Sequence, residues 1–167
     1  MSRPIGELNE LIREWAKARK LDTADPARQF LKVMEEFGKE LYPLVTTMEE
    51  PRVEEIIDAI GDTHVTLEIL ALQLGVVPFV SGTKEVAGLD NFGLADNMIV
   101  ALGNIAECIA KDRNAAEYIG YAQWLNECIS YSSIDYPPEL CIEAAYNEIK
   151  DRKGEMRNGV FVKEEDL

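Results

Sequence analysis

Apolar residues recur at spacings of three and four along most of the chain, and this periodicity constrains the fold more than any other feature. Such spacing places apolar side chains on one face of an α-helix, whereas a half-buried strand alternates them with polar residues. The clearest stripes are Ile5, Leu8, Ile12 and Trp15; Phe30, Met34, Phe37 and Leu41; and Val53, Ile56, Ile60 and Leu67. No convincing set of strands is present, so the sequence predicts an all-α helical bundle.

Proline and glycine mark where these helices begin and end, because proline fits the first helical turn and interrupts a helix interior. The expected starts are Asp25-Pro26, Glu50-Pro51 and Pro137-Pro138, and the expected breaks are Pro43, Gly75, Pro78 and Gly154. The two other helices are expected at about 94–111 and 113–132, with the last helix reaching about Lys153 and a short extended piece after it.

The helix that follows Pro51 is apolar nearly all round beyond Val65, which predicts that its second half is buried on every side. One short bundle does not easily cover residues 65–74 completely, and such helices often finish their core across a subunit interface. We therefore expect a homo-oligomer, a dimer or a tetramer.

The length of 167 residues suits a single domain, 1–167, with an internal repeat as one alternative. Ile60-Gly61 and Pro78 find equivalents at Ile119-Gly120 and Pro137 with one constant offset. On this interpretation residues 1–79 and 94–153 are two copies of a helix pair joined by the linker 80–93, and the second copy lacks the acidic residues. Chance agreement is the other explanation.

The chain is strongly acidic, with 31 acidic and 17 basic residues and a formal net charge of −14. Such a surface repels a nucleic-acid backbone, so we expect no nucleic-acid partner. A nucleotide would still bind through a divalent cation or a local basic cluster. The N-terminus has no apolar stretch typical of a signal peptide, and the apolar run 69–80 is too short to cross a bilayer. We expect a cytoplasmic protein that does not contact membranes.

The three cysteines, Cys108, Cys128 and Cys141, have no metal-binding spacing and are expected to be reduced. The single histidine, His64, lies in a helical pattern and is expected to be a packed residue rather than a ligand.

Two acidic clusters stand on neighbouring predicted helices. Glu36 and Glu40 share a face of the first helix, and Asp58 and Asp62 share a face of the second. Because a short connection makes the helices antiparallel neighbours, the four carboxylates form a candidate site for Mg²⁺ or Mn²⁺. The alternative is a pair of ordinary solvated faces, which we prefer for Glu54 and Glu55.

Asp62 is the most informative of these acids, since its face continues into the apolar half of the helix. A carboxylate in such a place needs a partner, either a metal ion or a basic side chain. Gln29 and Lys32 lie on the same face as Glu36 and Glu40, where a cation would suit a triphosphate oxygen. Alternatively, Lys32 and Glu36 form a plain ion pair at i,i+4.

The segments QFLKVMEEFGKEL and EEIIDAIGDTHVTLEILALQLG resemble the paired helices of the MazG-like family of all-α nucleoside triphosphate pyrophosphohydrolases. The ending AAYNEIKDRKGEMRNGVFVKE is similar to that of MazG-like proteins of phages and prophages. The resemblance implies a Mg²⁺-dependent enzyme that cleaves a nucleoside triphosphate into the monophosphate and pyrophosphate.

The resemblance is partial where the family carries EExxE and ExxD. Glu35 and Glu36 fill the first two acidic positions and Asp62 fills the last, but Lys39 and Ala59 stand at the other two. Glu40 and Asp58, one residue away, are the candidate replacements, although one residue rotates a helical side chain by about 100°. Asn147, Lys150 and Arg152 match positions where the family places residues near the nucleotide.

The hypothesis is therefore a nucleoside triphosphate pyrophosphohydrolase. Its expected metal ligands are Glu36, Glu40, Asp58 and Asp62; its catalytic residues Glu36, Glu35 and Lys32; and its substrate-binding residues Gln29, Lys32, Asn147, Lys150 and Arg152. The rival is a catalytically degenerate nucleotide- or protein-binding module, in which a salt bridge from Lys39 to Asp62 or Glu36 replaces the metal.

Overall fold

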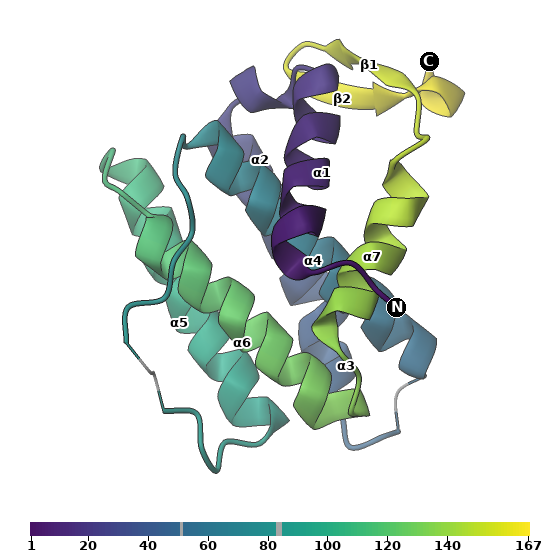
Figure 1. Cartoon of the computed structure of the whole chain (residues 1–167). Coiled ribbons are helices and arrows are strands. Elements are labelled where there is room, and N and C mark those ends of the chain that lie inside the picture. Colours follow the sequence, from purple (N-terminus) through teal and green to yellow (C-terminus); the bar gives the residue numbers. More distant parts are fainter. Residues whose placement is uncertain (51, 83–84) are drawn as a thin grey trace.

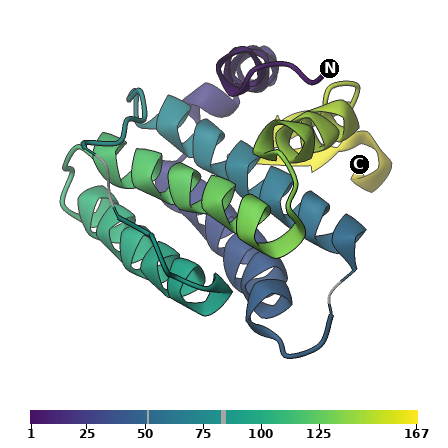
Figure 2. The same cartoon turned by 60° about the horizontal axis from the view of Figure 1, so that its bottom comes forward.

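Helix α4 runs through the middle of the molecule in a computed structural model; α1, α2, α6 and α7 pack against it, and α5 lies outside α6 (Figures 1 and 2). The structure describes residues 1–50, 52–82 and 85–167. The α-helices are α1 Ile5–Ala18, α2 Pro26–Met34, α3 Tyr42–Thr46, α4 Val53–Gln73, α5 Asn91–Ala110, α6 Ala116–Ile134 and α7 Pro138–Ile149. The remaining elements are the 3₁₀ turns η1 Leu21–Thr23 and η3 Glu164–Asp166, the π-helix η2 Glu35–Leu41, and the strands β1 Gly154–Arg157 and β2 Val160–Lys163. The all-α prediction is confirmed.

Capping side chains explain where two of the helices begin. The Asp25 carboxylate accepts from the N–H of Ala27 at 2.9 Å and starts α2 at Pro26, as predicted. Asp90 caps Gly93 in the same way, so α5 starts at Asn91, earlier than expected. Helix α6 starts later than expected, at Ala116, whose N–H donates to the side-chain oxygen of Asn114, two residues earlier, at 2.8 Å.

Two further boundaries differ from the predictions or lie outside the described residues. The predicted start at Glu50-Pro51 includes Pro51, which is outside them, and α4 begins at Val53. Residues 83 and 84 of the predicted linker are also outside. Helix α7 ends at Ile149 rather than Lys153, because the chain turns there into an antiparallel hairpin.

The second half of α4 is buried, as its composition predicts, but a single chain covers it. Leu67 and Leu70 are fully buried, and Val65 and Ile69 are 5% and 6% exposed. Helices α1, α2, α6 and α7 all pack on α4, so its apolar surface needs no second subunit. The argument that led from this helix to an oligomer is therefore wrong, although the oligomeric state itself stays a prediction.

The predicted apolar stripe of α2 and η2 is confirmed at Phe37 and Leu41, but Val33 is buried in place of Met34. Val33, Phe37 and Leu41 are buried, whereas Met34 is 38% exposed. These three buried residues follow one another at spacings of four, which suits the wider turn of η2 after α2.

Two glycines bring elements of the two predicted half-chains into close contact. A Cβ on Gly61 of α4 would meet the carbonyl oxygen of Cys141 and lie 2.7 Å from the Cβ of Ala145, both on α7. A Cβ on Gly120 of α6 would meet the backbone of Phe79, which follows α4. Gly61 of α4 thus contacts α7, the segment after α6, and Gly120 of α6 contacts the segment after α4. This reciprocal arrangement is the one that an internal repeat would give.

Polar side chains are also buried between the helices around α4. The carboxylate of Glu68 is 1% exposed, and it accepts from Arg13 of α1 at 2.5 Å and from Gln123 of α6 at 2.8 Å. His64 lies 2.8 Å from the Asn9 amide oxygen, and burial lowers its pKa to about 4. The prediction that His64 is a packed residue is confirmed, and the histidine is neutral at physiological pH.

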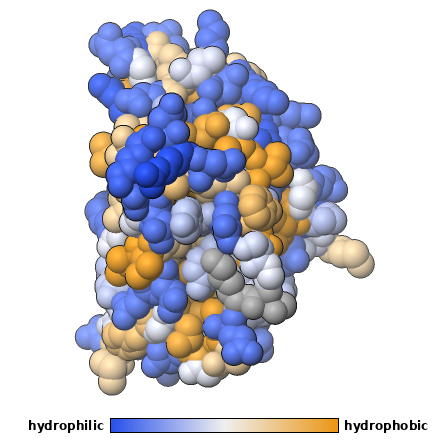
Figure 3. Space-filling model, turned by 90° about the vertical axis from the view of Figure 1, so that its left-hand side faces the viewer, coloured by the Kyte–Doolittle hydropathy of each residue, from blue (hydrophilic) through white to orange (hydrophobic). Residues whose placement is uncertain are grey.

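The face formed by α5 and α6 carries scattered apolar groups among polar ones (Figure 3). On α5, Ile99 and Val100 are 46% and 65% exposed. By length and composition alone, α5 is the one helix among the described residues apolar enough to cross a membrane, a property that core helices of soluble proteins share.

Candidate functional site

A pocket of about 280 Å³ lies between the η2–α3 segment and the first half of α4, and we call it the acidic pocket. It brings together all four predicted metal ligands, with a fifth carboxylate and a lysine. The lining residues are Glu36, Lys39, Glu40, Pro43, Leu44, Glu55, Asp58, Ala59 and Asp62. The predicted meeting of the two acidic helices is therefore confirmed.

The π-helix η2 determines which side chains of the first acidic cluster reach the pocket. Pro43 has no N–H for the carbonyl of Lys39, so the α-helical hydrogen-bond ladder cannot continue there. The N–H of Tyr42 instead bonds the carbonyl of Phe37, five residues back. As a result Lys39 and Glu40 both line the pocket. Short π-helical segments are frequent at functional sites.

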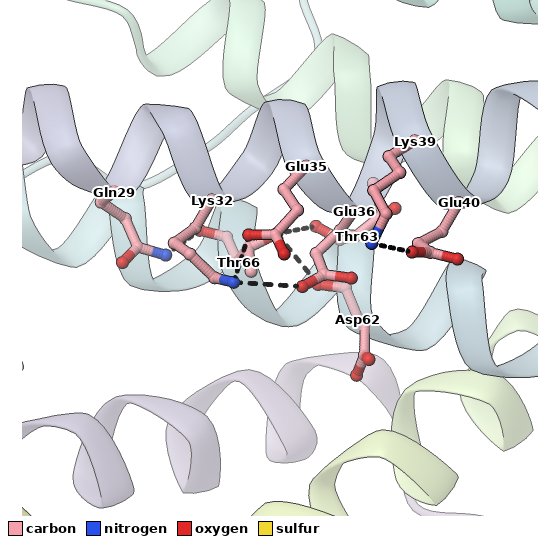
Figure 4. A network of polar contacts seen from close by, with 9 residues as sticks. All are labelled: Gln29, Lys32, Glu35, Glu36, Lys39, Glu40, Asp62, Thr63 and Thr66. Atoms are coloured by element: carbon pink, nitrogen blue, oxygen red, sulfur yellow. Dashed lines mark hydrogen bonds and ion pairs between the residues drawn. The ribbon is translucent and has the colours of Figure 1, made fainter. Parts of the chain in front are cut away.

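Asp62 is a half-buried carboxylate, and its carboxyl oxygens have no hydrogen-bond or ion-pair partner among the described residues. Burial raises its pKa to about 7, and the charges of Asp58, Glu36 and Glu148 add to the effect, while Arg152 opposes it. In Figure 4 its side chain points away from the cluster around Lys32. Asp62 is thus a carboxylate of the acidic pocket that lacks a polar partner among the described residues.

Glu36 is the second carboxylate of the acidic pocket whose pKa is raised. Burial raises its pKa, and the nearby charges of Glu35 and Glu40 raise it further, while Lys32 lowers it. The ammonium of Lys32 lies 3.7 Å from its carboxylate. Glu36 and Asp62 therefore repel each other across the pocket, a repulsion that a bound cation would relieve.

Lys39 does not form the salt bridge that the rival hypothesis assigns to it. Its ammonium lies 3.0 Å from the carboxylate of Glu40, and both side chains are largely exposed (Figure 4). This pair raises the pKa of Lys39. Lys39 therefore forms its ion pair with Glu40 and not with Asp62 or Glu36.

The donor chemistry of the acidic pocket fits a hard divalent cation, because every anionic group in it is a carboxylate. The fit is incomplete in geometry: among residues 1–50, 52–82 and 85–167, no three His, Cys, Asp or Glu side chains lie close enough together to hold a metal ion.

Two residues predicted to take part in catalysis lie at the edge of the pocket. Glu35 is exposed and forms an ion pair with Lys32 at 2.5 Å, which lowers the pKa of its carboxyl group. Lys32 also lies near Glu36 and thus links the two glutamates (Figure 4). Neither Glu35 nor Lys32 is among the residues that line the acidic pocket, and their catalytic roles stay predictions.

The predicted substrate-binding residues are divided between two places. The side-chain amide of Gln29 donates to the carbonyl of Thr66 at 3.1 Å and ties α2 to α4. Asn147 and Lys150 are exposed and bonded to each other at 3.0 Å, outside the acidic pocket. Only Arg152 lies near enough to Asp62 to act on its charge.

Sequence reasoning missed two acids near the site. Glu55 lines the acidic pocket, although we had assigned it to a solvated face. It shares a helix face with Asp58 and Asp62 at spacings of three and four, and this spacing alone would have placed Glu55 with the candidate metal ligands. Glu148 of α7 acts on the charge of Asp62, and this contact depends on the packing of α7 against α4.

Comparison with known proteins gives one similarity. A stretch of 73 residues, 41% of this chain, is 37% identical to an uncharacterized 18.2 kDa protein in the rep-hol intergenic region of Haemophilus phage HP1 (strain HP1c1). The alignment spans 42% of that phage protein. No protein-family model and no solved structure matches the chain. This similarity to a phage protein assigns no activity to the chain.

Proposed function

We propose that the protein is a nucleoside triphosphate pyrophosphohydrolase that uses Mg²⁺ or Mn²⁺ and releases a monophosphate and pyrophosphate. The observation that carries this proposal is the acidic pocket, where Glu36, Glu40, Asp58 and Asp62 line one space. The resemblance of the acidic helices to MazG-like enzymes supplies the reaction. The acidic protein would bind so negative a substrate only with a cation between them.

The roles follow from the positions of the side chains. Glu36 and Asp62 would hold the cation, since both are half-buried and both have a raised pKa. Asp58 and Glu40 would complete the set from the opposite walls. When bound, a divalent cation neutralises phosphate charge and lowers the pKa of a coordinated water. Lys32 and Arg152 would position phosphate oxygens, as their places beside Glu36 and Asp62 allow.

A catalytically degenerate binding module is the second candidate. The observation that favours it is the pocket wall itself, where Lys39 and Ala59 stand at positions that the family fills with acids. The absence of three gathered carboxylates in the described residues points the same way. A binder of this kind would still hold a nucleotide or a protein partner, but it would not release pyrophosphate.

The test is a screen of ribo- and deoxyribonucleoside triphosphates with Mg²⁺ and with Mn²⁺, measuring pyrophosphate and the monophosphate. Glu36→Gln and Asp62→Asn should each lower the rate by at least a hundredfold, because the cation carries most of the transition-state charge. Glu54→Gln is the matched control, since Glu54 is an exposed acid of α4 outside the pocket. If no triphosphate yields pyrophosphate above the rate of Asp62→Asn, the enzyme proposal is rejected.

A further inference from the structure

A second and larger cleft, of about 650 Å³, lies between the end of α7 and the C-terminal hairpin. We call it the hairpin cleft. Three cations line it, Arg152, Lys153 and Lys163, together with four carboxylates that include Glu148 and Asp151. Neither Lys153 nor Lys163 belongs to the site derived above.

The hairpin cleft is a built feature, because its two walls are fastened to the bundle. The guanidinium of Arg19 donates to the carbonyl of Arg152 through Nε at 3.1 Å and through a second N–H group at 2.5 Å. Trp15 packs edge-on against Phe161 of β2 with ring centroids 6.1 Å apart. The N–H of Glu164 bonds the carbonyl of Lys153 at 3.0 Å, which closes the hairpin against the end of α7.

The cations of this cleft are not committed to protein partners. The side chains of Arg152 and Lys153 make no ion pair or hydrogen bond among the described residues. Lys163 has only Glu165, at 4.0 Å. In a chain with fourteen more acidic than basic residues, this cleft gathers three cations, and two of them have no side-chain partner among the described residues.

The hairpin cleft adjoins the acidic pocket. Helix α7, whose end lines the cleft, packs on α4, which carries Asp62 of the pocket, and Arg152 and Glu148 at this end are close enough to act on the charge of Asp62. A molecule held at Asp62 could therefore extend past Arg152 toward Lys153 and Lys163.

We propose that the hairpin cleft binds the polyphosphate chain of the substrate as its magnesium complex, an inference that rests on the proposed function for the identity of that substrate. Lys153 and Lys163 contact phosphate oxygens, and the carboxylates face the cation of the complex. A bare polyphosphate would be repelled by the four carboxylates, and free Mg²⁺ by the three cations. The complex satisfies both sets of charges.

The test measures binding of inorganic pyrophosphate with Mg²⁺ by calorimetry, using the whole chain. The double variant K153Q/K163Q should bind at least tenfold more weakly than the wild type. The control K17Q/K111Q removes the same charge from exposed lysines of α1 and of the end of α5, and it should bind like the wild type. Omitting Mg²⁺ should weaken binding to the wild type at least tenfold.

Three results would overturn the inference: no binding by the wild type, equal binding by K153Q/K163Q and its control, or equal binding with and without Mg²⁺. Hydrolysis, measured in parallel, separates the two proposals. Weakened pyrophosphate binding in K153Q/K163Q without hydrolysis by the wild type supports the cleft and rejects the enzyme. If K153Q/K163Q hydrolyses the triphosphate with the KM of the wild type and binds pyrophosphate with the same affinity, the cleft inference is rejected and the enzyme proposal remains.

Discussion

Arg13 of α1 and Glu68 of α4 form a buried ion pair, in which Nε lies 2.5 Å from a carboxylate oxygen and Glu68 is 1% exposed. The other oxygen of Glu68 accepts from the amide of Gln123 at 2.8 Å, so one carboxylate joins α1, α4 and α6. A further N–H group of Arg13 donates to the carbonyl of Val76 at 3.3 Å, just past the end of α4. This cluster fixes how α1 lies on the central helix.

Replacing Arg13 with methionine should strongly destabilise the protein. The change leaves the Glu68 carboxylate buried without its cation, which typically costs about 3–5 kcal/mol. Urea unfolding followed by circular dichroism would measure the loss. The double variant R13M/E68M is the control, and it should be more stable than R13M alone, because no unpaired charge remains. Equal stability of the two variants would mean that the ion pair contributes little.

Gly61→Ala should separate α4 from α7 and destabilise the fold. The added methyl group would meet the carbonyl oxygen of Cys141 and would lie 2.7 Å from the Cβ of Ala145. Overpacking of this kind costs roughly 1–3 kcal/mol. The matched control is Gly103→Ala on α5, where nothing lies within 4 Å and alanine should stabilise the helix by about 0.5–1 kcal/mol. Thermal unfolding should move the two variants in opposite directions.

The sequence predicts the helices and the meeting of Glu36 with Asp62, because both follow from short-range periodicity and from one short connection between neighbours. The π-helix is not predictable in this way. It depends on Pro43, which removes a hydrogen bond, and on the packing that keeps Phe37 and Leu41 inward.

The hairpin shows a local signal that sequence reasoning used only in part. Asn158-Gly159 adopts positive φ angles of 51° and 79°, as a two-residue hairpin turn requires, and the flanking residues pair in register. The sequence predicts a short β-like or extended piece there, without its pairing into a hairpin. The approach of Glu148 and Arg152 to Asp62, by contrast, is a tertiary contact between α4 and the end of α7, and no local pattern encodes it.

Mg²⁺ or Mn²⁺ should raise the melting temperature of the protein, since a ligand that binds only the native state stabilises it. Free metal at ten to a hundred times its Kd would add roughly 1.4 to 2.7 kcal/mol. For a chain of this size each kcal/mol raises Tm by about 2–4 °C. Differential scanning calorimetry at several metal concentrations would measure the shift.

The variants locate the metal effect within the molecule. Glu36→Gln should lose most of the increase in Tm, whereas Glu54→Gln, an exposed acid outside the pocket, should keep it. A Tm that does not move with millimolar Mg²⁺ or Mn²⁺ would remove the metal site from the proposal.

Asp62→Asn should make the metal-free protein more stable at high pH. The folded pKa of Asp62 is about 7, raised from 3.8 mainly by burial. The folded state therefore binds the proton of Asp62 more tightly than the unfolded state does. The contribution of this proton to the free energy of unfolding is complete below about pH 4 and is lost as the pH rises through 7. The difference of about three pKa units corresponds to at most roughly 4 kcal/mol. Asparagine has the shape without the charge, so the variant should not show this loss.

The same variant separates the two proposed functions when stability and metal binding are measured together by urea unfolding at pH 4 to 8. If Asp62 is a metal ligand, Asp62→Asn is more stable than the wild type at pH 8, equally stable near pH 4, and no longer stabilised by Mg²⁺. If a lysine instead neutralises Asp62 in solution, asparagine leaves that ammonium unpaired and lowers stability at pH 8. The structure favours the first outcome, because Lys39 lies 3.0 Å from Glu40 and forms no ion pair with Asp62. A less stable variant with unchanged metal affinity would exclude Asp62 as a ligand and support the binding module.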